Sequence, residues 1–252
     1  MDWRGRAVCT VFFRGCPIHC SYCQNEGILS GEDFREITEI RDLIKSSSPY
    51  ISGIVFSGGE PTMQKEALIE LACYAKSQDL KVGIQTNGFF SGTIETLLEE
   101  KLLDKVALDF KSRFEGYSGE PGTNDTHFQN YERNARKTFQ LCKTAYAKDI
   151  LKEFEVVLTV FYENENYIEE ISDMIAKIPL VLQQGEHKVL RLRDLPPNIS
   201  EGEYRERKRK LQESYHPLTL DEIKRLADRL GRKVRIRTRD VGEIIYKSGA
   251  GS

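Results

Sequence analysis

The residues of this 252-residue chain that most clearly could do chemistry are three cysteines. Cys16, Cys20 and Cys23 follow the spacing Cys-x3-Cys-x2-Cys within the segment FFRGCPIHCSYCQN. Three thiolates on one short loop can bind a single metal centre. A structural zinc site usually has four protein ligands, whereas an iron–sulfur cube with three thiolates keeps one iron open for a chelating substrate. The spacing therefore favours a [4Fe–4S] cluster on these three cysteines.

Two other interpretations of the loop stay open. Zinc could take His19 as a fourth ligand, although its position next to Cys20 makes joint coordination awkward. A redox pair of Cys20 and Cys23 would leave Cys16 unexplained. The remaining cysteines occur singly and are expected to be small apolar core residues: Cys9, Cys73 and Cys142.

Short apolar runs alternate with helical patterns along the first three quarters of the chain. The expected strands are Val8–Phe13, Gly53–Ser57, Lys81–Thr86, Lys105–Phe110, Phe154–Phe161 and Lys188–Arg193. The expected helices are Thr38–Lys45, Gln64–Ser77, Thr93–Lys101, Asn134–Ala147 and Glu165–Ala176. This alternation predicts an α/β fold with a parallel sheet and right-handed crossovers. Six strands are too few for a closed eight-stranded barrel, so we expect a partial barrel.

The first four expected strands end in sequences suited to a site. The strand ends are followed by Arg14-Gly15-Cys16, Gly58-Gly59-Glu60-Pro61, Asn87-Gly88 and Asp109-Phe110-Lys111. Parallel strands bring their carboxyl ends to one edge of a sheet, and sites usually lie there. The sequence thus predicts one site built from four strand ends.

The pattern around the cysteines resembles a known superfamily. Cys-x3-Cys-x2-Cys after a first strand, with Tyr22 before the last cysteine, resembles the radical S-adenosylmethionine (SAM) superfamily. The longer pattern from Phe13 to Asn25 is similar to the activating enzymes of glycyl radical proteins, such as pyruvate formate-lyase and the anaerobic ribonucleotide reductase. The preceding residues Asp2–Arg6 fit the same group, and the resemblance covers about residues 2–193.

The resemblance implies a fold, cofactors and an activity. It implies a partial (β/α)6 radical SAM barrel over residues 1–193, and residues 194–252 are then expected to form a linker and a short α/β extension packed on the barrel. The activity implied is that of a radical SAM oxidoreductase, which cleaves SAM at a [4Fe–4S] cluster into methionine and a 5′-deoxyadenosyl radical. The radical would install a glycyl radical on a partner enzyme.

The resemblance also assigns residues to SAM binding. The implied contacts are Tyr22, Gly58, Gly59, Glu60, Thr86, Asn87, Asp109 and Lys111. A monovalent cation beside Asp109 is implied as well, although this chain has the neutral Gln85 where relatives often carry Asp. For each motif a structural interpretation also exists: a glycine turn at Gly58-Gly59, a strand-end cap at Asp109, a solvated charge at Lys111.

Composition bears on the partners and the location of the protein, and the last quarter of the chain has its own predicted elements. Charged residues make up 30% and the formal net charge is −2, which suits a soluble globular protein and gives no case for nucleic acid. No run is long enough to span a membrane and no signal pattern opens the chain, so we expect a cytoplasmic protein without a membrane partner. The segment Tyr204–Glu213 reads as a solvated linker or surface helix, and an amphipathic helix (Leu218–Leu230) and a half-exposed strand (Val234–Arg239) follow it.

Three classes of function remain at this stage. The first is a glycyl radical enzyme activase that draws electrons from a flavodoxin or ferredoxin, because no second cluster is encoded. The second is a radical SAM enzyme acting on another peptide, a tRNA or a small metabolite. The third is a non-catalytic iron–sulfur or zinc protein, which would not need the Gly58-Gly59-Glu60-Pro61 loop.

Overall fold

In the computed structural model, the described residues are 3–18, 20, 22–29, 31–111, 126–185, 200–214 and 217–249. They fall into two compact units, which are taken in turn. The first unit holds the described residues within Met1–His19, Gln24–Phe110 and Ser118–Val156, and the second holds those within Cys20–Cys23, Lys111–Tyr117 and Val157–Ser252. The expected sixth strand, Lys188–Arg193, lies outside the described residues.

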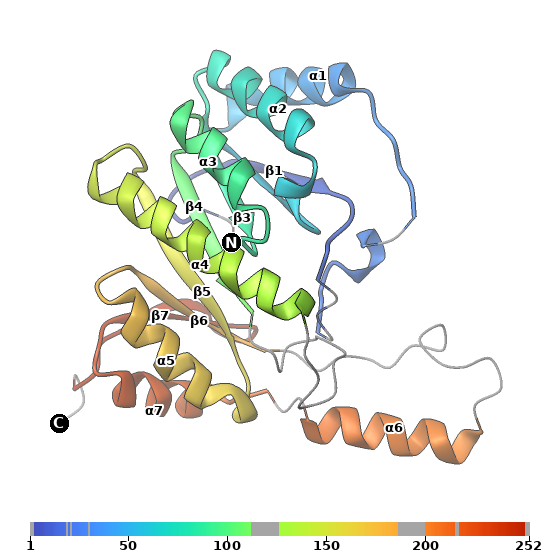
Figure 1. The fold of residues 1–252 in the computed structure, drawn as a ribbon, viewed down its shortest axis with the longest axis vertical. Coiled ribbons are helices and arrows are strands. Elements are labelled where there is room, and N and C mark those ends of the chain that lie inside the picture. Colours follow the sequence, from blue (N-terminus) through green and yellow to red (C-terminus); the bar gives the residue numbers. More distant parts are fainter. Residues whose placement is uncertain are drawn as a thin grey trace. The chain divides into compact units, whose positions relative to one another are not determined.

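The first unit is a parallel sheet with helices between its strands (Figure 1). Its strands are β1 (Val8–Phe13), β2 (Gly53–Gly58), β3 (Lys81–Thr86) and β4 (Lys105–Phe110), all as expected to within one residue. Each pairs in parallel with the next along the chain. Their carboxyl ends therefore lie at one edge of this sheet, as the sequence predicts.

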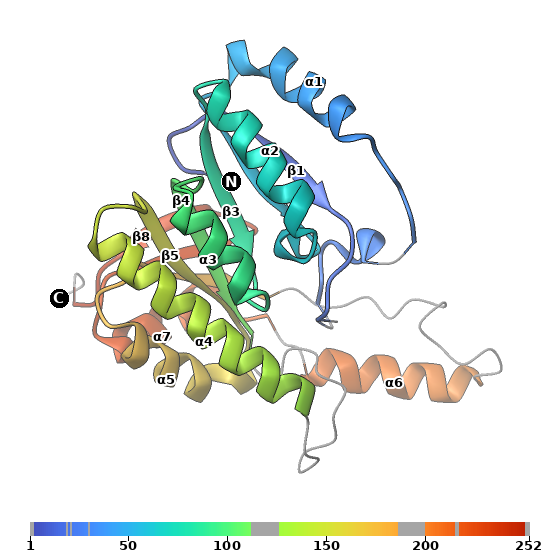
Figure 2. The same cartoon turned by 45° about the horizontal axis from the view of Figure 1, so that its top comes forward.

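Four helices accompany these strands: α1 (Ile37–Ser47), α2 (Lys65–Ser77), α3 (Ser91–Glu99) and α4 (Thr126–Ala147). α1 packs beside α2, and α3 packs beside α4, as both views show (Figure 2). α4 begins at Thr126, whereas the sequence predicts Asn134. Phe128 and Tyr131 are buried in the added turns, in helical phase with the buried Ala135.

In the second unit, strands and helices again alternate. β6 (Leu180–Gln184) pairs in parallel with β7 (Val234–Thr238), and β8 (Gly242–Tyr246) pairs antiparallel with β7. The helices are α5 (Glu165–Ile175), α6 (Glu201–Ser214) and α7 (Leu220–Leu230), of which α5 and α7 pack together. β5 (Glu153–Val160) begins in the first unit and ends in the second. Short 3-10 helices lie at Glu26–Ile28, Ser48–Tyr50, Pro61–Met63 and Tyr162–Asn164.

Two elements of the second unit differ from the sequence expectation. β6 at Leu180–Gln184 was not expected, because its short apolar run follows a helix directly and shows no alternation. β7 alternates buried and half-exposed residues as predicted, but its antiparallel partner β8 was missed. The predicted domain boundary between residues 193 and 194 falls among residues that are not described, and it stays a prediction.

The segment Tyr204–Glu213 lies in the surface helix α6. Arg205 pairs with Glu201, and both Arg209 and Lys210 pair with Glu206 within the helix. In these pairs the positive charges are already balanced by carboxylates of the same helix, so they form no unpaired basic surface for a phosphate backbone. Within the described parts of the chain, no helix combines the length and hydropathy needed to cross a bilayer.

Trp3 fills the amino-terminal side of the first unit's sheet. Its side chain is 2% exposed, and its indole N–H donates to Glu153 Oε1 at 3.0 Å. A Cβ added at Gly83 would lie 3.0 Å from the Trp3 ring, so the ring packs directly on that glycine. The buried Lys105–Glu155 ion pair lies in the same region, with Lys105 Nζ 5.7 Å from the centre of the indole.

We expect Trp3→Ala to lower the free energy of unfolding by about 3–5 kcal/mol, because it leaves a cavity over Gly83 and removes a partner of Glu153. Urea unfolding followed by circular dichroism measures it. Tyr50→Ala is the control, since Tyr50 is 82% exposed and its loss should change stability by less than about 0.5 kcal/mol. Equal stability of the two variants would contradict the packing role of Trp3.

Candidate active site at the carboxyl ends of the strands

Two glycines at the end of β2 let its loop approach the backbone that follows β1. A Cβ on Gly58, whose φ is +118°, would lie 2.4 Å from Phe13 O, and a Cβ on Gly59 would lie 1.9 Å from Gly15 O. No other residue type fits at that separation. The Gly59 N–H donates to Phe13 O and the Glu60 N–H donates to Gly15 O, both at 2.8 Å. The β1–β2 pairing thus continues into the segment that leads to Cys16.

Residues after the cysteine motif also fix this segment. Asn25 donates its side-chain amide to Gly58 O at 2.9 Å. The Gly15 N–H donates to Ile28 O at 2.9 Å, and Gln64 Nε2 donates to Arg14 O at 2.9 Å. Gly15 has a φ of +88°, which favours glycine at the turn before Cys16. The motif that extends from Phe13 to Asn25 in the sequence is therefore anchored at both ends in the first unit.

The Glu60 carboxylate joins the ends of β2 and β3. Glu60 is fully buried. Its Oε1 accepts hydrogen bonds from the Thr62 N–H at 3.0 Å, the Thr62 hydroxyl at 2.5 Å and the Thr86 hydroxyl at 2.7 Å. Its Oε2 accepts the Asn87 N–H at 2.7 Å. Sequence reasoning connects Glu60 with SAM, and the structure shows that it also organises the neighbouring strand ends.

Burial and hydrogen bonding act in opposite directions on this group. Burial raises the pKa of Glu60, while the hydrogen bonds donated by Thr62, Asn87 and Thr86 lower it, and the net direction is upward. A buried carboxylate is tolerated only where donors of this kind surround it. Thr86, Asn87 and Glu60 are therefore interdependent, although the resemblance implied a role for each of them separately.

Asn87 uses both ends of its side chain. Its Oδ1 accepts the Phe89 N–H at 2.9 Å, and its Nδ2 donates to Cys16 Sγ at 3.5 Å. The Ile18 N–H also donates to Cys16 Sγ, at 3.4 Å. Two donors directed at one sulfur suit a thiolate that ligates iron, because hydrogen bonds to sulfur stabilise its negative charge. The chemistry around Cys16 therefore fits the implied cluster.

The other cysteines of the motif belong to the second unit. Cys20 and Cys23 are half-buried, and the Cys23 N–H donates to Cys20 O at 3.1 Å. His19 lies outside the described residues. Among those that are described, no three or more His, Cys, Asp or Glu side chains are gathered as a metal site. The ligand assignment therefore remains a prediction from spacing, resemblance and the environment of Cys16.

The single cysteines differ from one another in burial. Cys142 is buried and burial raises its pKa, which agrees with a core role. Cys9 is half-buried, whereas Cys73 is exposed. The expectation of a core position is thus wrong for Cys73, which lies on the outer side of α2.

Tyr22 and Lys111 meet in the second unit. Lys111 is 8% exposed, and its Nζ donates to Tyr22 Oη at 3.2 Å and lies 5.1 Å from the centre of that ring. The Tyr22 ring packs on Phe161 with 5.0 Å between ring centres, and Tyr167 donates its hydroxyl to Lys111 O at 3.2 Å. Neither Phe161, which follows the end of β5, nor Tyr167 in α5 was singled out from the sequence, because aromatic residues in such apolar patterns are typical of a core.

Gln85 and Asp109 are the residues that bear on the implied cation. Gln85 Oε1 accepts the Ser57 hydroxyl at 2.7 Å, so the amide at the position where the resemblance implies a carboxylate is engaged with β2. Asp109 lies near the end of β4 and is partly exposed. The cation beside Asp109 stays a prediction.

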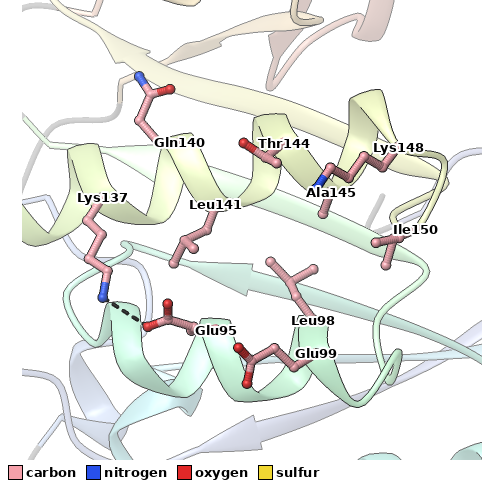
Figure 3. A pocket seen from close by; sticks show the side chains of 10 residues that line it. All are labelled: Glu95, Leu98, Glu99, Lys137, Gln140, Leu141, Thr144, Ala145, Lys148 and Ile150. Atoms are coloured by element: carbon pink, nitrogen blue, oxygen red, sulfur yellow. Dashed lines mark hydrogen bonds and ion pairs between the residues drawn. The ribbon is translucent and has the colours of Figure 1, made fainter.

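A shallow groove of about 410 Å³ lies elsewhere in the first unit, between α3 and α4 (Figure 3). Leu98 and Leu141 line its apolar part, and the Glu95–Lys137 ion pair, at 2.9 Å, closes one end. None of the predicted site residues lines it. The groove therefore does not belong to the candidate site.

Known proteins are similar to this chain in sequence and in fold. The family described as the radical SAM superfamily matches residues 10–175. Over 193 residues the chain is 32% identical to a protein of Methanocaldococcus jannaschii with the provisional name glycyl-radical enzyme activating enzyme MJ1227, which covers 75% of this chain and 77% of that protein. Over 107 residues it is 36% identical to the pyruvate formate-lyase-activating enzyme of Clostridium pasteurianum, covering 40% of this chain and 44% of that enzyme.

Among solved structures, TYW1 with a lysine-pyruvate adduct bound superposes with a TM-score of 0.55. The alignment covers 96% of this chain and 79% of TYW1 at 13% sequence identity, which shows a shared fold and nothing more. The predicted fold class, α/β with the parallel sheet of this superfamily, is thereby confirmed.

We expect Gly59→Ala to destabilise the first unit by about 3 kcal/mol or more, because its Cβ has no space beside Gly15 O. Thermal and urea unfolding measure the loss. Gly92→Ala is the matched control: Gly92 lies exposed in α3 with nothing within 4 Å of an added Cβ, so alanine should raise stability by about 0.5–1 kcal/mol. A Gly59→Ala protein as stable as the parent would show that the two loops are not held this closely.

Proposed function

This chain belongs to the radical SAM superfamily, and from that premise we propose that it is an activase that installs a glycyl radical on a partner enzyme. The observation that carries the proposal is the 32% identity to an activating-enzyme relative over 77% of that relative's length. The superfamily implies a [4Fe–4S] cluster and SAM as cofactors. The network around Glu60 supports a site of this kind at the ends of β2 and β3.

Cys16, Cys20 and Cys23 are the proposed cluster ligands. The Asn87 amide and the Ile18 N–H direct donors at the Cys16 sulfur, which would stabilise the negative charge of a ligating thiolate. When bound, the cluster and SAM supply the electron transfer, the carbon–sulfur cleavage and the hydrogen-atom abstraction. The protein's task is to hold the ligand loop, orient SAM and exclude water.

The proposed SAM contacts divide by chemistry. Lys111 offers an ammonium for the SAM carboxylate, and Tyr22 offers an aromatic face for the adenine. Asp109 contributes a carboxylate near the end of β4, where the predicted monovalent cation would also lie. Gly58 and Gly59 are proposed to contact SAM through their main chain, since the space of their side chains is taken by the backbone of Phe13 and Gly15. Glu60, Thr86 and Asn87 set the shape of that main chain.

The partner and the electron donor are proposed from chemistry. A glycine suits abstraction because its Cα radical is delocalised over two amides and no side chain hinders the approach. Since the sequence encodes no second cysteine cluster, a flavodoxin or ferredoxin is the proposed source of electrons. The paired charges of α6 give no reason to propose RNA as the substrate.

We expect Cys16→Ala, Cys20→Ala and Cys23→Ala each to abolish cluster assembly and SAM cleavage, because a cube with two protein thiolates is not retained. Iron and sulfide content after oxygen-free reconstitution measure the first, and 5′-deoxyadenosine release measures the second. Cys9→Ala and Cys73→Ala are the controls and should retain both. A parent protein that binds zinc tightly and takes up no iron would contradict the assignment.

The activase proposal predicts where the abstracted hydrogen comes from. With reduced enzyme, SAM and an oxygen-free glycyl radical enzyme, a persistent doublet should appear on that partner by electron paramagnetic resonance. Deuterium on the partner's glycine α-carbon should then be found in 5′-deoxyadenosine by mass spectrometry. Label that arrives instead from another peptide, a tRNA or a small metabolite would leave the superfamily assignment intact and exclude the activase.

A further inference from the structure

The Asn87 side chain connects the strand-end network to a cysteine of the motif. It is 7% exposed, so its amide groups are largely removed from water. Its Nδ2 donates to Cys16 Sγ at 3.5 Å, within the range for a hydrogen bond to sulfur, whose radius exceeds that of oxygen. Asn87 lies 71 residues further along the chain than Cys16, so the fold creates this contact and local sequence does not.

Four further hydrogen bonds set the position of the Asn87 amide, two made by Asn87 itself and two by the preceding Thr86. The main-chain N–H donates to the buried Glu60 carboxylate at 2.7 Å. The side-chain Oδ1 accepts the Phe89 N–H at 2.9 Å, which leaves the Nδ2 group directed at the sulfur. The preceding Thr86 hydroxyl donates to Glu60 at 2.7 Å and accepts the Gly88 N–H at 3.0 Å. The Nδ2 donor of Asn87 is thus fixed through hydrogen bonds to both the main chain and the side-chain oxygen of this residue.

A hydrogen bond to a ligating sulfur has a defined electrostatic effect. Reduction adds a negative charge to a cluster and spreads part of it onto the thiolates. A donor directed at one of these sulfurs stabilises the reduced form more than the oxidised form, so it raises the reduction potential. Because the electron must come from an external carrier, that potential decides how readily the cluster accepts it.

We propose that Asn87 is a positioning residue for the cluster: its amide donates to the Cys16 sulfur, stabilises the reduced form and raises the reduction potential. The inference rests on the proposed function, since it requires that Cys16 ligates a cluster. It assigns Asn87 a role besides the SAM contact that resemblance implies. Glu60 takes part through the Asn87 main chain.

The test compares variants of the reconstituted enzyme by redox titration, with the reduced cluster followed by electron paramagnetic resonance. Asn87→Ala removes the donor without adding charge. Asn87→Asp keeps an oxygen that accepts the Phe89 N–H, so it should fold even if the alanine variant does not. Its second oxygen replaces the donor beside the Cys16 sulfur with an acceptor. The matched control is Asn134→Ala, because the Asn134 amide donates to Asn130 O at 2.9 Å within α4 and takes no part in the cysteine motif.

We expect Asn87→Ala to lower the equilibrium constant for reduction up to about tenfold, which corresponds to about 59 mV for one electron. Asn87→Asp should lower it further, and Asn134→Ala should match the parent. An unchanged or raised potential in Asn87→Ala, with the cluster intact, would overturn the inference while leaving the proposed function standing. Failure of the parent protein to bind any cluster would instead refute the proposed function, on which the inference depends.

Discussion

The buried carboxylate of Glu60 is the contact on which the candidate site depends. It gathers the Thr62 N–H and hydroxyl, the Thr86 hydroxyl and the Asn87 N–H around two oxygens. These groups come from the turn after β2 and the end of β3, which the parallel pairing of the strands brings together. An ionised carboxylate costs several kcal/mol to bury alone, so the donors and the acceptor are each needed for the other to be stable. Removing any one of these groups therefore destabilises the ends of both β2 and β3, which are distant in sequence.

Such a network also explains why the loop must contain two glycines before Glu60. Directly before Glu60, the backbone at Gly59 passes so close to Gly15 O that any side chain would collide. The Glu60 N–H is then placed to donate to Gly15 O at 2.8 Å. The order Gly-Gly-Glu is thus a steric requirement of the fold in addition to its proposed role toward SAM, and the two interpretations weighed from the sequence are not exclusive.

The sequence predicted correctly those elements and motifs whose pattern lies within one short stretch of the chain. The strands β1 to β4 were predicted within one residue because short β-branched runs are bounded by polar turns. The cysteine spacing and the Gly-Gly-Glu loop pointed to the correct superfamily for the same reason. Contacts between distant residues could not be predicted in this way: the amide of Asn87 on Cys16, and Lys111 on Tyr22, depend on strand register and rotamers that no short window encodes. β6 was missed because five residues without alternation carry no periodic signal.

Glycine has a different use at each end of the sheet in the first unit. At the amino end, Gly83 makes room for the Trp3 ring, whose N–H donates to Glu153, and the result is a packed and largely dry support. At the carboxyl end, Gly58 and Gly59 make room for backbone, and the result is a hydrogen-bonded edge that holds Glu60 in place. Burying an aromatic ring stabilises the sheet without directing any polar group, whereas backbone contact orients N–H and carbonyl groups. Because the strands are parallel, both arrangements act on the same strands: the packed amino end stabilises the sheet through burial, and the polar carboxyl edge surrounds a buried carboxylate with donors.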